Sequence, residues 1–436
     1  MSIFRPIVKE EERTLEKRLR LFEATMAGVG YILGAGIYVL IGAVASSAGS
    51  AIWLAFILAG FAALTSGLSY AELASMFPVN ESEYKYAKEG LSEKFGFFSY
   101  ISIILALTIG IAGVSLGFAS YFSELTGFGN TGLIAVIVIL SFALLNWFSI
   151  KGAAKVTFLC TLASIIGLLT IVGLAVFNGN LSASYTEMPE GIMGVIQGAS
   201  LIFFAYLGFE GIVKLSDETK NARKTIPRAI ILAIIISTVV YIAVAIASVS
   251  VLSWQELAAS SAPLADVASA VMGSYAFTFL AIIALLSTSN TILMGILSSS
   301  RGFYGLGLIF KKFKFLSKVG IRNTPTRSII ITTLIALVFL LFDDISLIVG
   351  FTNFLIFVTF IIMNLAVINL RYKKPDLRRK FKVPLAIGKT PVIPVLGIVI
   401  SLFLMFNLQP INIITGIIVT IIIFGLYKLM HGKNGS

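Results

Sequence analysis

The sequence has very little of the chemistry that most enzymes and metalloproteins use. Its 436 residues include one cysteine, Cys160, and one histidine, His431, and only 12% of them are charged. A single cysteine excludes an intramolecular disulfide and a cysteine-ligated metal site. His431 follows the last apolar run, and no cluster of His, Asp or Cys lies inside such a run to serve a membrane hydrolase or a haem protein. We therefore expect no enzyme and no bound cofactor.

Apolar length is what the sequence has in excess. Hydrophobic residues make up 58% of the chain and the mean hydropathy is +0.98, more than one soluble core of this length could bury. A helix needs about 20 apolar residues to cross ~30 Å of hydrocarbon. Twelve runs approach or exceed that length, and we predict an all-α integral membrane protein with twelve transmembrane helices. The runs are 21–47, 51–77, 97–122, 133–150, 156–177, 191–213, 229–252, 265–299, 328–342, 346–370, 391–406 and 411–429.

Positive charge is missing from every second loop between these runs. The loops at 178–190 and 253–263, for example, contain none of the 33 Lys and Arg residues. Because Lys and Arg concentrate in cytoplasmic loops, we place the tails 1–20 and 431–436 and the basic loop 371–390 in the cytoplasm of a plasma-membrane protein. Topology also explains the net charge of +12, so the expected partner is the lipid bilayer and not a nucleic acid.

Two of the apolar runs are interrupted by glycine, at 28–37 (GVGYILGAGI) and at 204–211 (FAYLGFEG). Each glycine inside a helix costs roughly 1 kcal/mol relative to alanine, and at membrane depth a broken helix survives only where it lines a cavity. Five spans separate the two breaks, so the broken helices cross the membrane in opposite directions, as inverted repeats require. We predict five-helix repeats over 21–177 and 190–370, with helices 11 and 12 (391–430) outside them.

The helix ends at such breaks suit a zwitterion. Free amides at a helix N-terminus favour an anion, and free carbonyls at a C-terminus favour a cation. We expect a carboxylate on the amides of residues 34–36 and an ammonium group on carbonyls of both breaks, although close helix packing alone could explain single glycines. The predicted binding residues are Ile32, Leu33, Gly34, Ala35, Gly36, Phe204, Ala205, Leu207 and Gly208.

Five stretches, at 21–37, 204–210, 221–229, 300–325 and 371–384, carry a family resemblance that covers nearly the whole chain. The chain resembles the amino acid, polyamine and organocation (APC) family of secondary transporters, and in particular its prokaryotic amino-acid permeases. The resemblance implies the five-plus-five inverted-repeat fold shared with sodium-coupled amine transporters, and alternating access around the two breaks. It also implies that Phe204 is an aromatic lid and that Glu210 takes part in gating. The alternative for Glu210 is a hydrogen-bonded brace for freed amides.

Two departures from the family pattern concern coupling and substrate. Proton-coupled relatives have a lysine in the fifth helix where this chain has Ser164, so that device is absent. A sodium ion held by carbonyls of the first helix and by side-chain hydroxyls would be one substitute, and the possible coupling-ion residues are Ser164, Ser287 and Thr288. The other possibilities are proton coupling and exchange without a coupling ion. Hydroxyls in membrane helices often bond to their own backbone, which disfavours an ion site there. Cationic amino-acid permeases have a glutamate where this chain has Ala106, which favours a neutral amino acid.

The apolar pocket candidates are Ile109, Ala112, Phe209 and Phe354. A polyamine or other organic cation is the alternative substrate, but Glu210 is the only acid at hand for it. An ion channel is a remote alternative, because no selectivity-filter sequence is visible. A chain with two repeats can work as a monomer or as a homodimer.

Overall fold

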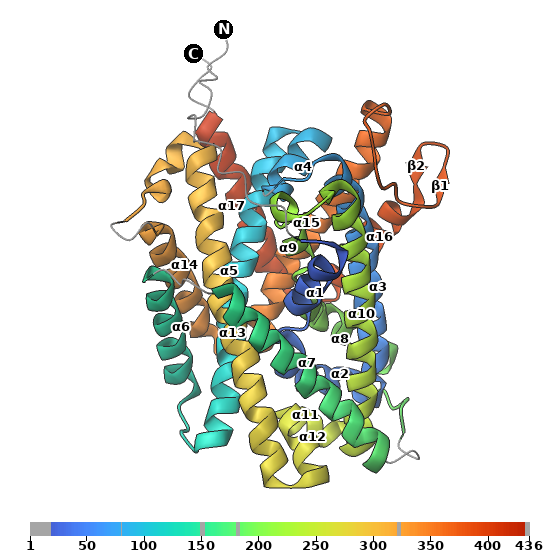
Figure 1. Cartoon of the computed structure of the whole chain (residues 1–436), viewed down its shortest axis with the longest axis vertical. Helices are drawn as coiled ribbons and strands as arrows, with labels where there is room; N and C mark the ends of the chain where they lie inside the picture. The colour runs from blue at the N-terminus through green and yellow to red at the C-terminus, as the bar shows by residue number, and fades with distance from the viewer. Residues whose placement is uncertain (1–18, 80, 149–152, 180–183, 321–323, 432–436) are drawn as a thin grey trace.

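The computed structural model of the protein describes residues 19–79, 81–148, 153–179, 184–320 and 324–431 (Figure 1). Most of the two predicted tails and the end of the fourth run, at Ile150, lie outside these ranges. The long helices are α3 (Ile52–Met76), α5 (Glu93–Thr126), α7 (Ala153–Asn178), α10 (Ala222–Val251), α13 (Ser274–Ile309), α15 (Ile345–Lys373) and α17 (Pro410–His431). The shorter helices are α1 (Leu21–Ile32), α2 (Gly36–Ala48), α4 (Ser82–Gly90), α6 (Thr131–Trp147), α8 (Gly191–Ile202), α9 (Phe209–Val213), α11 (Trp254–Ala259), α12 (Pro263–Met272), α14 (Thr326–Phe339) and α16 (Val392–Phe406).

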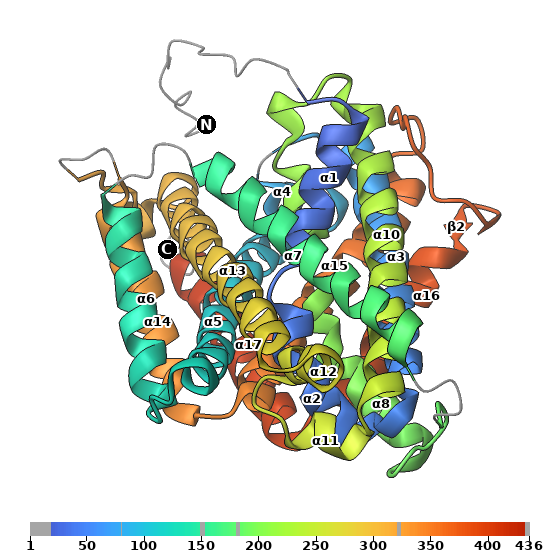
Figure 2. The same cartoon turned by 60° about the horizontal axis from the view of Figure 1, so that its bottom comes forward.

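These helices make an all-α integral membrane protein. Within the described ranges, eight helical segments are long and apolar enough to cross a membrane, and five shorter apolar helices accompany them. The twelve-span count stays a prediction. The helix α5 lies deepest, with 83% of its most apolar stretch buried, whereas α17 has 11% buried and lies at the periphery. Figure 2 shows α5 beside α6, α13 and α17, and α5 also packs against α15.

The two ends of the bundle differ in charge. One end carries α4 and a small hairpin of strands β1 (Ala386–Ile387) and β2 (Thr390–Pro391), and we call it the α4 end (Figure 1). The opposite end, the α11 end, carries α11 and α12. The segments 252–263 and 184–190 meet there, since Trp254 donates a hydrogen bond to Glu187 over 2.9 Å. Neither segment contains Lys or Arg.

The basic loop 371–390 is more ordered than its composition predicts. Glu72, fully buried near the end of α3, accepts hydrogen bonds from Arg371 Nε over 3.0 Å and from the Val383 amide over 2.8 Å. Arg379 Nε lies 3.3 Å from the same carboxylate. Membrane topology is therefore not the only reason for the positive charge of this loop, because two of its arginines compensate a buried charge.

Two further segments differ from a simple span-and-loop pattern. The residues 82–90, expected in a loop, form α4, which packs beside α5 and α15. The eighth run divides at Gly273, whose φ of +76° is a left-handed conformation that favours glycine. The short helix α12 therefore precedes α13 at the α11 end.

Candidate functional site

The first glycine-rich run breaks at residues 33–35, between α1 and α2. The Gly34 amide turns back and donates to the Ile32 carbonyl over 2.7 Å. The Ala35 amide donates to the hydroxyl of Thr291 on α13 over 3.3 Å. The break is thus held by its own backbone on one side and by α13 on the other.

The second run breaks at Leu207 and Gly208, between the 3-10 turn Phe203–Tyr206 and α9. Gly208 has a φ of +123°, and a side-chain carbon there would lie 2.8 Å from the backbone of Tyr31 on α1. Only glycine fits both requirements. The Gly208 amide donates to Glu210 Oε2 over 2.9 Å.

The two breaks touch each other. A Cβ on Gly36 would lie 2.5 Å from the Cα of Ala205, so the absent side chain is what lets the two backbones approach. The buried Tyr241 on α10 bridges them: its hydroxyl lies 2.6 Å from the Ile32 carbonyl and 2.9 Å from the Ala205 carbonyl, and the single proton is shared between them. Tyr241 is not among the binding residues predicted from the sequence. A tyrosine in the middle of an apolar run, which needs a hydrogen-bond partner when buried, was the available signal.

Several polar backbone groups at the breaks keep no partner among the described residues. They include the amides of Gly36 and Ile37, at the start of α2, and the carbonyls of Leu33 and Leu207. The other predicted acceptors are occupied: the Phe204 carbonyl accepts the Leu207 amide over 3.1 Å. The first break therefore has free amides and both breaks have a free carbonyl, a set of groups that suits a ligand with one negative and one positive group.

Phe204 precedes the second break and Glu210 follows it. The half-buried Phe204 ring lies against α5, where a Cβ on Gly110 would be 2.9 Å from its nearest carbon. Glu210 is 2% exposed and its carboxylate holds the Gly208 amide. This contact is the brace that was the alternative to gating, and the gating role stays a prediction.

The candidate ion ligands behave differently from one another. The hydroxyls of Ser164 and Thr288 donate to carbonyls of their own helices, over 2.9 Å to Cys160 and 2.7 Å to Ala284. The Ser287 hydroxyl is buried without a hydrogen-bond partner among the described residues. Ser287 is therefore the one of the three whose buried hydroxyl still lacks an interaction that an ion could supply. The Ser164 carbonyl accepts from the Tyr38 hydroxyl over 3.0 Å, which ties α7 to α2.

The apolar pocket candidates divide into two pairs. Ile109 and Ala112 are buried on α5 on either side of Gly110, which meets Phe204. The Phe209 ring instead packs on Phe360, with 5.3 Å between ring centroids, and Phe354 packs against Gly416 of α17. Of the four, therefore, only Ile109 and Ala112 lie near the α5 residue that meets Phe204, within two positions of it along the chain.

A cavity of about 340 Å³ lies beside α2 at the α11 end. Tyr38 and Tyr121 line it, and the Tyr121 hydroxyl donates to the Tyr38 carbonyl over 3.1 Å. Asp343 and Asp344 also line it, and no Lys or Arg does. The cavity therefore joins the acidic end of the bundle to the helix that follows the first break.

Comparison with known proteins gives matches over nearly the whole chain. The amino acid permease family model matches residues 19–427. The chain is 29% identical to the branched-chain amino acid permease BcaP of Bacillus subtilis, covering 97% of this chain and 95% of the relative. It is 28% identical to the methylthioribose transporter of the same organism, covering 97% and 96%. It is 27% identical to the branched-chain amino acid permease BcaP of Lactococcus lactis, covering 88% and 87%.

Proposed function

Since the chain belongs to the amino acid permease family, we propose that it is a secondary active transporter that moves neutral amino acids across the plasma membrane by alternating access. The family match makes it a multi-pass amino-acid transporter and not an enzyme. The observation that carries the finer proposal is the meeting of two helix breaks at Gly36 and Ala205, with free amides and free carbonyls beside it.

The proposed architecture has twelve spans, with inverted repeats over 21–177 and 190–370 and two peripheral helices over 391–430. The breaks at 33–35 and 207–208 support it because each repeat then contributes one broken helix to a shared site. The α4 end is the cytoplasmic one in this proposal, because the loops that meet at the α11 end lack Lys and Arg.

The free backbone groups favour one orientation of the substrate. Its carboxylate binds the amides of Gly36 and Ile37 at the start of α2, where the helix dipole adds its positive end. Its ammonium group binds the carbonyls of Leu33 and Leu207. The Ile32 and Ala205 carbonyls, expected as ligands, are held by Tyr241 and set the spacing between the two breaks.

A neutral, apolar side chain fits the surroundings of the site. The apolar residues Ile109 and Ala112 lie within two positions of Gly110 on α5, and the interior of α5 carries no acid that would pair with a cationic side chain. Two relatives named as branched-chain amino acid permeases support this choice. The relative named as a methylthioribose transporter provides a second candidate, a neutral thiosugar, which would leave the carboxylate position without a negative group.

Alternating access requires a closure on each side of the site. We assign the closure on the outer side to Phe204, because its ring reaches from the second break to α5. The cavity lined by Tyr38 and Tyr121 is the corresponding outer approach, at the acidic end. Glu210 acts on the inner side through the Gly208 amide, because losing that hydrogen bond would free the second break to move.

The coupling ion is proposed to be sodium, with Ser287 as the side-chain ligand. Its buried hydroxyl has no partner among the described residues, and it lies one helical turn before Thr291, which bonds to the first break. Sodium prefers hard oxygen ligands of this kind. Proton coupling and substrate exchange are the other possibilities that the experiment must separate.

The test is uptake by purified protein in liposomes. Labelled leucine, other amino acids, a polyamine and methylthioribose are presented under a sodium gradient, a proton gradient, or a counter-substrate gradient, each imposed alone. We expect uptake of apolar amino acids driven by sodium. Uptake of methylthioribose alone would show that the substrate is a thiosugar and not an amino acid. Uptake driven by a gradient other than sodium would show that sodium is not the coupling ion. If no amino acid enters or exchanges under any gradient, the proposal is wrong.

A further inference from the structure

A second cavity, of about 750 Å³, lies at the α4 end, away from the two breaks. That size falls within the range of small-ligand pockets, about 300–1,000 Å³. No Asp or Glu lines it. The side chains around it come from three segments: Pro78 follows α3, Lys220, Asn221, Arg223 and Lys224 surround the start of α10, and Lys380 belongs to the loop after α15.

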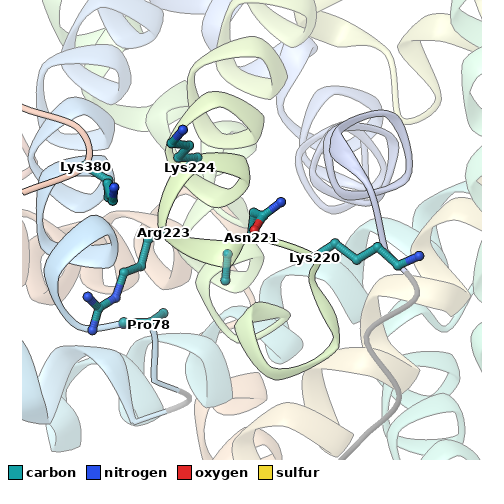
Figure 3. A pocket seen from close by; sticks show the side chains of 7 residues that line it. Pro78, Lys220, Asn221, Arg223, Lys224 and Lys380 are labelled. Atoms are coloured by element: carbon teal, nitrogen blue, oxygen red, sulfur yellow. The ribbon is translucent and has the colours of Figure 1, made fainter.

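The positive charges around this cavity are not compensated within the described part of the chain. None of its Lys and Arg side chains makes an ion pair or a side-chain hydrogen bond there. Figure 3 shows Lys380 and Lys224 above Arg223, whose side chain runs down to the level of Pro78, and Lys220 extending away to the right. Like charges so close together repel one another, and a bound anion would remove that repulsion.

The wall that carries Lys380 is held in place by buried contacts. Its neighbour Arg379 pairs with Glu72 and donates to the carbonyls of Leu370 and Leu377. The Phe381 carbonyl accepts the Ser75 hydroxyl over 3.1 Å. Lys380 is thus fixed against the end of α3 by the residues on both sides of it, and does not depend on a flexible loop for its position.

The wall at α10 is also held, and it adds backbone donors. The Lys220 amide donates to the Leu19 carbonyl over 2.8 Å, within a short parallel bridge between Leu19 and Thr219. Asn221, with a φ of +51°, makes no side-chain capping bond to α10. The amides of Ala222 and Arg223 keep no partner among the described residues, at the positive end of a 30-residue helix.

Membrane topology explains why these residues are basic, but it does not require them to converge on one concavity. We propose that this cavity binds a phosphate-bearing anion, whose oxygens accept from the Arg223 guanidinium, the first amides of α10 and the ammonium groups of Lys224 and Lys380. A guanidinium and backbone amides at a helix N-terminus are donors suited to phosphate. The ligand is either the headgroup of an anionic lipid or a free phosphate compound. The bound anion would join α10, through Arg223 and Lys224, to the loop after α15, through Lys380.

The test measures binding directly and does not depend on transport. Purified full-length protein in detergent is titrated with pyrophosphate by calorimetry, and with phosphatidylglycerol or phosphatidylcholine by native mass spectrometry. The double variant Arg223→Gln/Lys380→Gln removes two cations from the cavity. The control, Lys311→Gln/Lys318→Gln, removes the same charge from exposed lysines that make no described contact. Because all four side chains are exposed, thermal unfolding of both variants should match that of the parent protein.

We expect the cavity variant to weaken anion binding about 30-fold, and the control to leave it unchanged. Binding of pyrophosphate identifies a free phosphate compound as the ligand, and selective retention of phosphatidylglycerol alone identifies a lipid headgroup. If the protein binds neither pyrophosphate nor phosphatidylglycerol, the proposal is overturned. Equal loss in both variants also overturns it, because the effect would then be one of net charge.

Discussion

The contact between the two breaks can be tested with one added carbon atom. In Gly36→Ala the new Cβ would lie 2.5 Å from the Ala205 Cα and 2.7 Å from its Cβ. Carbon atoms without a bond between them prefer about 3.5–4.0 Å, so the two backbones would have to separate by about 1 Å. The nearest atom belongs to a main chain and cannot turn away. Overpacking of this kind costs about 1–3 kcal/mol.

The expected result is a loss of substrate binding of roughly 5- to 150-fold, which is that energy converted at 1.4 kcal/mol for each factor of ten. The free amides of α2 and the free carbonyl of Leu207 act on one ligand only while the breaks stay together. Binding is measured with labelled substrate on purified protein, after gel filtration has verified that the variant is inserted and monodisperse.

The matched control is Gly173→Ala on α7, where an added Cβ meets nothing within 4 Å. It should bind substrate as the parent protein does. Unchanged binding in Gly36→Ala would refute the reasoning, because the contact of the two breaks would then not define the site. Equal loss in both variants would refute it too, since the effect would reflect any glycine in a helix.

Four further outcomes follow from the contacts described above. Tyr241→Phe removes the donor shared by two buried carbonyls and should lower stability by about 1–3 kcal/mol in thermal unfolding, and an unchanged midpoint would show that the carbonyls find other donors. Ser287→Ala should raise the sodium concentration for half-maximal uptake roughly tenfold, and equal sodium dependence in parent and variant would rule out that ligand. Glu72→Gln should lower the free energy of unfolding by about 3–5 kcal/mol, because it leaves buried arginines without a counter-charge. The more exposed pairs of Glu89 with Lys85 and Lys374 should contribute less than about 1 kcal/mol each. Hydrogen bonds from Lys374 and Lys85 lower the pKa of Glu89 from its usual 4.5. Its contribution to the free energy of unfolding is therefore present above pH 4.5 and is lost as the pH falls through the lowered pKa. Glu89→Gln should reduce this loss of stability at low pH in unfolding scans.

The positions of the breaks were predictable from the sequence because glycine acts locally. Gly208 allows a backbone turn that another residue would oppose, and Gly34 leaves room for the Thr291 hydroxyl, so the pattern of glycine in an apolar run locates the break to within a residue or two. The all-α membrane class was predictable for a similar reason, since apolar length is a property of each segment by itself.

The partners of the breaks were not predictable, because they depend on how distant helices pack. Thr291 and Tyr241 reach the first break from α13 and α10, and nothing in their own segments indicates that direction. The hydroxyl run around Ser287 suggested an ion site, but only packing separates a free hydroxyl from one bonded to its own helix, as Thr288 is. The sequence indicates only that the loop 371–390 is basic. Its buried partner Glu72 lies far away in the sequence, so their ion pair could not be predicted.

That distance has a consequence for biosynthesis. Arg371 follows Glu72 by 299 residues, so at synthesis rates of about 5–20 residues per second the carboxylate waits roughly 15 to 60 s for its first cation. During that time Glu72 has none of these cationic partners, so it stays either hydrated or protonated. The α4 end therefore closes late, once α15 has emerged, and a nascent chain that stops before residue 371 cannot bury this carboxylate as a paired charge.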